Sequence, residues 1–95
     1  MSLDVEWDPE KAASNASKHG VTFDEAATVL ADVLSVTFPD LDHSGEEERL
    51  LLFGQSETGR FLVVSLTERD DAIRIISARQ MTSRERREYE SGTRT

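Results

Sequence analysis

The spacing of apolar residues changes near residue 32, and this change limits the folds available to the chain. Between residues 23 and 31 they recur every three or four positions, as on the buried face of a helix. From residue 34 onward they alternate or run continuously, as in strands. The order of helices and then strands indicates an α+β domain. The residues of the helical stripe are Phe23, Ala26, Ala27, Leu30 and Ala31.

Start and stop signals locate the expected helices. Asp8 precedes Pro9, which suits the first position of a helix, and Gly20 is placed to end that helix in a left-handed conformation. The next two helices start with capping boxes, in which a threonine is followed three residues later by a glutamate. These boxes are Thr22 with Glu25 and Thr82 with Glu85, and the last helix runs to about Tyr89.

The remaining apolar segments predict five short strands. Pro39 ends the second strand and the acidic segment 40–48 reads as an exposed loop. Turn residues at 57–59 and 70–71 predict hairpins. The expected fold is a small antiparallel sheet, made of a four-stranded meander plus a short N-terminal strand, packed with two N-terminal helices and one C-terminal helix. The expected strands are 5–7, 34–38, 50–53, 61–67 and 73–77, and the run at 50–53 suggests cover on both faces.

Length and composition exclude several classes of protein. Ninety-five residues form one domain, 1–95, with a small core, so a second copy or a partner is expected to add stability. The chain has no cysteine, which excludes disulfides, thiolate zinc sites and cysteine nucleophiles. No apolar run approaches the roughly 18 residues of a membrane span, and the first residues do not resemble a signal peptide. We therefore expect a cytoplasmic protein without a membrane partner.

The charge is unevenly distributed. The net charge is −8, which at first argues against nucleic acid as a partner. Residues 1–71 hold five Lys or Arg against sixteen Asp or Glu, whereas residues 72–95 hold six Arg against three Glu. Arginine suits bidentate phosphate contacts. The alternative is an Arg-rich exposed helix whose charges pair with neighbouring glutamates.

Two groups of polar residues are candidates for a site. Lys11, Asn15 and Lys18 share one face of the first helix and His19 follows them, although an ordinary surface helix shows the same pattern. Arg74 and Arg79 belong to the second group, around the last hairpin. They differ in parity, so a regular strand would point them to opposite faces, and they converge only if the strand ends or bulges before Arg79. The other members of this group are Glu68, Arg69, Arg84, Arg86, Arg87 and Tyr89.

Sequence motifs for a cofactor or a metal are weak or missing. The chain has no phosphate-binding loop, no Gly-rich dinucleotide fingerprint and no His-Glu-x-x-His helix. Asp40, Asp42 and His43 could ligate a metal, but three donors in an acidic loop are a weak signal against a solvated loop. We therefore expect no cofactor and no metal.

Two longer motifs resemble a known family. W-D-P-E-K-A-A-S-N-A-S-K-H-G-V-T-F-D-E-A, from Trp7 to Ala26, resembles the opening of the BrnT toxin family. R-I-I-S-A-R-Q-M-T-S-R-E-R-R-E-Y, from Arg74 to Tyr89, looks like its closing motif. The resemblance implies a RelE-like ribonuclease toxin of a type II toxin–antitoxin system. It also implies a BrnA-like antitoxin with a ribbon-helix-helix DNA-binding domain, and a toxin dimer in a 2:2 complex.

The resemblance also suggests a mechanism. RNA can be cleaved without a metal because the ribose 2′-hydroxyl is a built-in nucleophile, so the enzyme must move two protons and stabilise charge on the phosphate. Our hypothesis is that Arg74 and Arg79 hold the phosphate, that His19 or Glu68 takes the 2′ proton, and that Tyr89 or His19 assists the leaving group. Further contacts to RNA are assigned to Lys11, Lys18, Arg69, Arg84 and Arg87.

Other interpretations of the same residues stay open. His19 also suits a partner for the dipole at the end of a helix, Glu68 a surface ion pair, and Tyr89 a core residue with a polar tip. The competing function is a non-catalytic module that binds the antitoxin and acts as co-repressor, which the net charge of −8 favours. A homodimeric scaffold is a third possibility.

Overall fold

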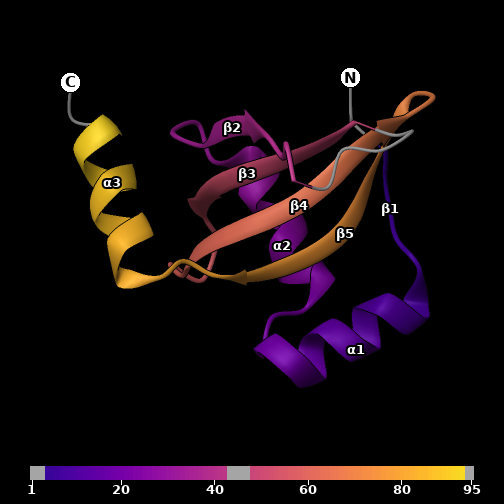
Figure 1. Cartoon of the computed structure of the whole chain (residues 1–95). Helices are drawn as coiled ribbons and strands as arrows, with labels where there is room; N and C mark the ends of the chain where they lie inside the picture. The colour runs from indigo at the N-terminus through magenta and orange to yellow at the C-terminus, as the bar shows by residue number, and fades with distance from the viewer. Residues whose placement is uncertain (1–3, 43–47, 94–95) are drawn as a thin grey trace.

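The structure is a computed structural model that describes residues 4–42 and 48–93 (Figure 1). It contains three helices, a short 3-10 turn and five strands within these residues. In chain order they are β1 (Asp4–Glu6), α1 (Pro9–His19), α2 (Phe23–Thr28), the 3-10 turn η1 (Val29–Ala31), β2 (Val36–Pro39), β3 (Arg49–Gln55), β4 (Phe61–Arg69), β5 (Ala72–Gln80) and α3 (Ser83–Thr93).

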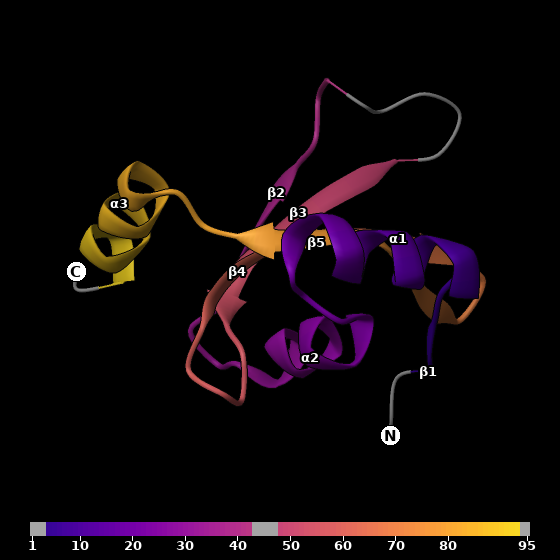
Figure 2. The ribbon, with the colours of Figure 1, turned by 90° about the horizontal axis from the view of Figure 1, so that it is seen from below.

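The five strands form one sheet in the order β1-β5-β4-β3-β2. Strands β2 to β5 form the antiparallel meander that the sequence predicts, while β1 joins β5 in parallel, so the sheet is mixed. Helices α1 and α2 lie against the sheet, and α3 stands apart from them beyond the end of β5 (Figures 1 and 2). The predicted α+β class is confirmed. Within the described residues, no helix has the length and apolar character needed to cross a membrane.

The predicted helix caps are present. The Asp8 carboxylate accepts an N–H from the first turn of α1, and Gly20 ends that helix with a left-handed φ of 68°. The Thr22 hydroxyl accepts an N–H from the first turn of α2 at 3.1 Å. At α3 the box is reciprocal, because the Glu85 N–H donates to the Thr82 hydroxyl at 3.1 Å and the Thr82 N–H donates to the Glu85 carboxylate at 2.9 Å. Local hydrogen bonding therefore sets these helix starts.

The core lies between one face of the sheet and the first two helices. Trp7 meets the Phe23 ring edge-on at 5.9 Å between centroids and closes one side of this core. On β3, Leu52 points into the core and is buried, whereas Leu51 and Phe53 on the other face are half-buried. The strand is therefore fully covered on one face and partly on the other. The buried core residues are Val21, Phe23, Ala26, Val29, Leu52, Leu62, Val64, Leu66, Ile75 and Ala78.

Strand β2 is shorter than the alternation predicts. It begins at Val36, and Leu34 lies outside it with 58% of its surface exposed. The Leu34 N–H donates to the Asp32 carboxylate at 2.9 Å in a turn that follows η1. Because this turn uses the local backbone, the chain becomes extended two residues later than expected. β2 also lies at the edge of the sheet, which leaves Phe38 half-exposed.

Asn15 joins α1 to the sheet. Its side chain is buried, and its amide donates to the Ala78 carbonyl at 2.8 Å and to the Val21 carbonyl at 2.9 Å. Its own carbonyl accepts the Ala78 N–H at 3.1 Å. Lys11 and Lys18 remain exposed, so Asn15 does not join them in a surface patch. The Asn15 amide bonds to the edge of β5 as the backbone of a neighbouring strand would. It does so at Ala78, beyond Arg74, the last β5 residue that pairs with β1.

We expect Asn15→Leu to lower the free energy of unfolding by about 2–4 kcal/mol, because it leaves the Ala78 N–H and two carbonyls without partners in the interior. Urea unfolding followed by circular dichroism measures this loss. The control is Ser14→Ala, at the exposed neighbouring position of α1, which should change stability by less than about 0.5 kcal/mol. An equal loss in both variants would contradict the role of Asn15.

Candidate functional site

A β-bulge in β5 decides where the arginines of the last hairpin point. Leu66 of β4 pairs with Ile75, but the preceding Ser65 pairs with Ser77, so Ile76 is an extra residue on β5. The extra residue reverses the alternation of side chains in the rest of the strand. This is the irregularity that the different parity of the two arginines requires.

The register then puts Arg74 and Arg79 on the same face of the sheet. Arg74 pairs with Thr67 and Arg79 pairs with Val63, and these two β4 residues are an even number of positions apart on a regular strand. The two β4 partners, Thr67 and Val63, are four positions apart. The backbones of the two arginines therefore lie about 13 Å apart along the sheet. The face is opposite the one that packs on α1 and α2. We call it the arginine face.

A third arginine, which no pattern in the sequence relates to the other two, lies on this face. Arg49 of β3 pairs with Thr67, so Arg49, Thr67 and Arg74 form a row across three strands. Ser65 and Ser77 form part of the next row. Arg49 lies in the acidic half of the sequence, and only the strand register relates it to the hairpin arginines. The face therefore combines three guanidinium groups with hydroxyl groups.

Carboxylates already hold two of these arginines. Arg74 lies 3.6 Å from the Glu6 carboxylate on β1. Arg79 donates two hydrogen bonds to Glu85 on α3, at 2.7 and 3.0 Å. Because of this bidentate pairing, the pKa of Glu85 falls to about 2 and the pKa of Arg79 rises. The partners come from different elements, Glu6 from the edge strand β1 beside Arg74 and Glu85 from α3 after the end of β5.

Tyr89 anchors α3 to the rest of the molecule. Its hydroxyl donates to the Leu34 carbonyl at 3.1 Å and approaches the Asp32 carboxylate at 3.3 Å. Its ring meets Phe61 edge-on at 6.0 Å between centroids. Burial, and then the nearby Asp32 charge, raise the pKa of this tyrosine. The Tyr89 hydroxyl is thus kept protonated and is shared between two acceptors.

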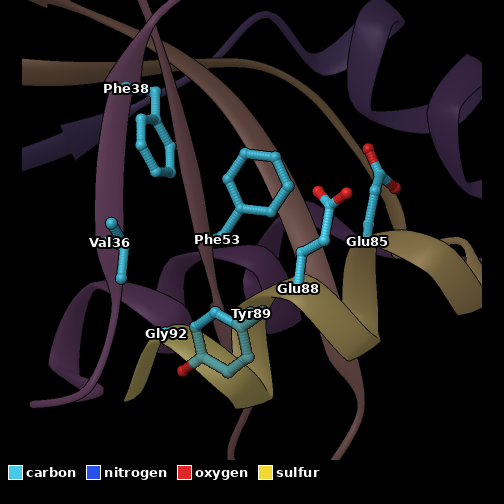
Figure 3. Close-up of a pocket in the computed structure, with 7 residues that line it drawn as sticks. All are labelled: Val36, Phe38, Phe53, Glu85, Glu88, Tyr89 and Gly92. Carbon is cyan, nitrogen blue, oxygen red and sulfur yellow. The ribbon is translucent and has the colours of Figure 1, made fainter. Parts of the chain in front are cut away.

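Beside Tyr89 lies a mostly apolar hollow of about 320 Å³ (Figure 3). Side chains of β2 and β3 face those of α3 across it. The hollow is on the same side of the sheet as Arg79, because Val36, Phe53, Val63 and Arg79 belong to one row of paired residues. Its lining residues are Val36, Phe38, Phe53, Glu85, Glu88, Tyr89 and Gly92.

The structure does not bring the other candidate catalytic residues to the arginine face. Glu68 pairs with Ile73 near the end of β4, is exposed, and points to the opposite side from Thr67. His19 is exposed at the end of α1, which packs on the core face. The remaining basic candidates are exposed and spread over three elements. They are Lys11 and Lys18 on α1, Arg69 on β4, and Arg84 and Arg87 on α3.

A second polar cluster, which the sequence analysis missed, connects α2 to the β3–β4 turn. The Glu25 carboxylate accepts hydrogen bonds from Arg60, from Ser56 at 2.8 Å and from Thr58 at 2.7 Å. Arg60 also donates to the Gly20 carbonyl at 2.9 Å. These bonds, with that from Arg60 the strongest, lower the pKa of Glu25 to about 2. The sequence shows Glu25 only as part of a capping box, since its partners are more than thirty residues away.

The described residues contain no group of three or more His, Asp or Glu side chains that could hold a metal ion. Asp40 and Asp42 lie just after β2. His43, the third donor considered in the sequence, lies outside the described residues.

Two comparisons relate this chain to known proteins, one through its sequence and one through its fold. Residues 7–85 match the family model described as the ribonuclease toxin, BrnT, of a type II toxin-antitoxin system. The 1.1 Å crystal structure of the Brucella abortus ribonuclease toxin BrnT superimposes with a TM-score of 0.67 and 22% sequence identity. The alignment covers 86% of this chain and all of the other. No curated protein sequence matches the chain.

These findings define first a class of protein, the toxins of type II toxin–antitoxin systems, for which an antitoxin partner is implied. Because the family model spans most of the chain, the protein belongs to the BrnT ribonuclease toxin family. The resemblance noted in the sequence is therefore confirmed. The structural likeness, at 22% identity, supports the fold alone.

The Glu25–Arg60 cluster makes stability depend on pH. The pKa of Glu25 is lower in the folded protein than its ordinary 4.5, so its contribution is complete above about pH 4.5 and disappears as the pH falls toward 2. We expect Glu25→Gln to be less stable than the parent by up to about 3 kcal/mol at pH 7. The difference should shrink steadily below pH 4.5.

Chemical denaturation at a series of pH values measures this effect. Glu57→Gln is the matched control, because Glu57 is exposed in the same β3–β4 turn and should give the parent's curve. A difference between Glu25→Gln and the parent that stays constant from pH 7 to pH 2 would argue against the pairing.

Proposed function

We propose that this protein is a toxin that cleaves RNA endonucleolytically without a metal, by attack of the ribose 2′-hydroxyl on the adjacent phosphate. Membership of the BrnT ribonuclease toxin family supports the reaction class. The observation that carries the proposal is the bulge in β5, which puts Arg74 and Arg79 on one face together with Arg49. Several guanidinium groups on one face can bind an RNA backbone and stabilise charge on a reacting phosphate.

We assign the stabilisation of phosphate charge to Arg74 and Arg79. In the absence of RNA their positive charges are partly neutralised by Glu6 and Glu85, so a phosphate must replace these carboxylates as the partner of each guanidinium. Phosphate forms the same bidentate contacts as a carboxylate, which makes the exchange possible without moving the strands. Tyr89 adds a protonated hydroxyl on α3, the same helix that carries Glu85.

The proton transfers are not assigned to Glu68 or His19. The Glu68 side chain points to the opposite side of the sheet from the two arginines, and His19 ends α1, which packs on that opposite side. A phosphate held by Arg74 or Arg79 would lie across the sheet from Glu68. Under this proposal, Glu68 and His19 contribute to the surface and to the end of α1, respectively.

The proposed biological setting follows the family. Cleavage of RNA would halt translation in the cytoplasm, and a BrnA-like antitoxin with a ribbon-helix-helix DNA-binding domain would neutralise the toxin. A toxin dimer bound by two antitoxins in a 2:2 complex is the proposed assembly. A partner agrees with the small core of a 95-residue chain, which limits its stability alone.

One observation favours a second candidate function, a non-catalytic module that binds the antitoxin and acts as co-repressor. Glu6 and Glu85 hold the two arginines, and the chain as a whole carries a net charge of −8. Both features weaken attraction to RNA. Incubation of the purified protein with RNA in the presence of EDTA separates the two functions, since only the nuclease produces fragments with 2′,3′-cyclic phosphate ends.

Arg79→Ala and Arg74→Ala should each reduce this cleavage by about 100-fold or more, because each removes a donor that stabilises charge in the transition state. Fragment formation over time measures the rate. Ser14→Ala is the control, since Ser14 is exposed on α1, which packs on the opposite face of the sheet, and it should cleave at the parent's rate. Unchanged cleavage by both Arg79→Ala and Arg74→Ala would remove the arginine face from the reaction.

Glu68→Gln and His19→Ala should keep cleavage within about threefold of the parent, because neither side chain belongs to the arginine face. The same assay, repeated from pH 5 to pH 8, tests this. If His19→Ala lost activity together with a change in the pH profile, the histidine would be a proton-transfer group, and our placement of the site on one face would be wrong.

A further inference from the structure

The exposed apolar residues of the molecule gather at one edge of the sheet. Among the described residues, four large apolar side chains are exposed, and all lie within nine positions around β2. Val33 is 95% exposed and Leu41 is 82% exposed, on either side of the strand. Exposed apolar groups that cluster in this way mark an interaction surface more often than chance exposure does. The other two residues are Leu34 and Phe38.

The hollow described above opens beside this edge. Phe38 and Phe53 meet edge-on at 5.7 Å between ring centroids and form one wall, and Tyr89 on α3 forms the other (Figure 3). A space of about 320 Å³ is large enough for an aromatic or branched aliphatic side chain. The exposed edge and the hollow together form a surface that can hold an apolar anchor.

The charges around the hollow indicate what kind of partner fits. Glu85 and Glu88 are part of its lining, where Glu85 pairs with Arg79 and Glu88 pairs at the surface with Arg84, and the Glu88 side chain is 69% exposed. The chain has a net charge of −8, so a second copy of it would bring the same negative charge against this surface. Pro39 at the end of β2 has no N–H, which limits pairing of a further strand at this edge. A positively charged segment with an apolar anchor fits better than a second copy.

We propose that the hollow between β2, β3 and α3 is the docking site for the antitoxin, occupied by a segment in which an apolar side chain is flanked by Lys or Arg. The identity of the partner rests on the proposed toxin function. Glu85 lines the hollow and also holds Arg79. A segment seated there lies next to Arg79 and covers that end of the arginine face, which explains how docking prevents RNA from binding.

The test compares the parent toxin with four variants for binding to the purified antitoxin by calorimetry. Phe38→Glu introduces a charge into the wall of the hollow and should raise Kd by about tenfold or more. Ala13→Glu introduces the same charge at an exposed position of α1, away from the hollow, and should leave Kd within about twofold. Glu88→Lys should also raise Kd, and its charge-matched control, Glu57→Lys in the β3–β4 turn, should not.

Glu88→Lys keeps the test informative if Phe38→Glu does not fold, because Glu88 is exposed and the ion pair with Arg84 that the change removes is also at the surface. Equal Kd values for Glu88→Lys and Glu57→Lys, together with equal values for Phe38→Glu and Ala13→Glu, would overturn the proposal. It would also be overturned if Phe38→Glu converted a toxin dimer to a monomer in analytical ultracentrifugation without changing the Kd for the antitoxin.

Growth assays separate this proposal from the proposed function. The parent should arrest growth when expressed alone and should be relieved by the antitoxin. Phe38→Glu should arrest growth and resist relief. If the parent protein causes no growth arrest, the toxin function is contradicted. The Kd values from calorimetry then still test the docking site. A Phe38→Glu toxin that the antitoxin relieves as fully as the parent contradicts the docking site.

Discussion

The amide of Asn15 is bound to the backbone of Ala78 by two hydrogen bonds, at 2.8 and 3.1 Å, and much of the architecture depends on this pair. β1 pairs with β5 only as far as Arg74, so the next part of the β5 edge needs another partner. Asn15 supplies it and attaches α1 to the sheet. The extra residue of the bulge, Ile76, lies between these two attachments. The pairing with β1 and the bonds to Asn15 thus fix the strand before and after the bulge. The bulge in turn places Arg79 on the same face as Arg74.

The two faces of the sheet consequently differ in chemistry. One is covered by α1 and α2 and holds the apolar core, whose burial supplies the main stabilisation. The other carries arginines and hydroxyl groups toward β5 and an apolar hollow toward β2. α3 connects these two regions, because Glu85 holds Arg79 and Tyr89 reaches back to Asp32 and Leu34. The regions that we propose for RNA binding and for partner binding therefore lie side by side on one surface.

Much of the fold follows from local signals, and its exceptions have local causes. Pro9, Gly20 and the two capping boxes predict helix ends because their hydrogen bonds close within a few residues. The alternation that begins at Leu34 starts too early, because Asp32 takes the Leu34 N–H into a turn. The parallel pairing of β1 with β5 joins segments almost seventy residues apart, and no short-range pattern encodes it.

The candidate site shows the same division. The sequence alone shows the arginine-rich hairpin, the likeness to the BrnT family and the need for an irregular strand before Arg79. These features depend only on residue type and on whether positions are odd or even. The sequence does not show that Arg49 joins the hairpin arginines, or that Glu6 and Glu85 neutralise two of them. Nor does it show that Asn15, spaced like a member of a surface stripe, is buried. These facts depend on strand register and helix docking, which are set by packing among residues far apart in the chain, so only the tertiary structure decides them.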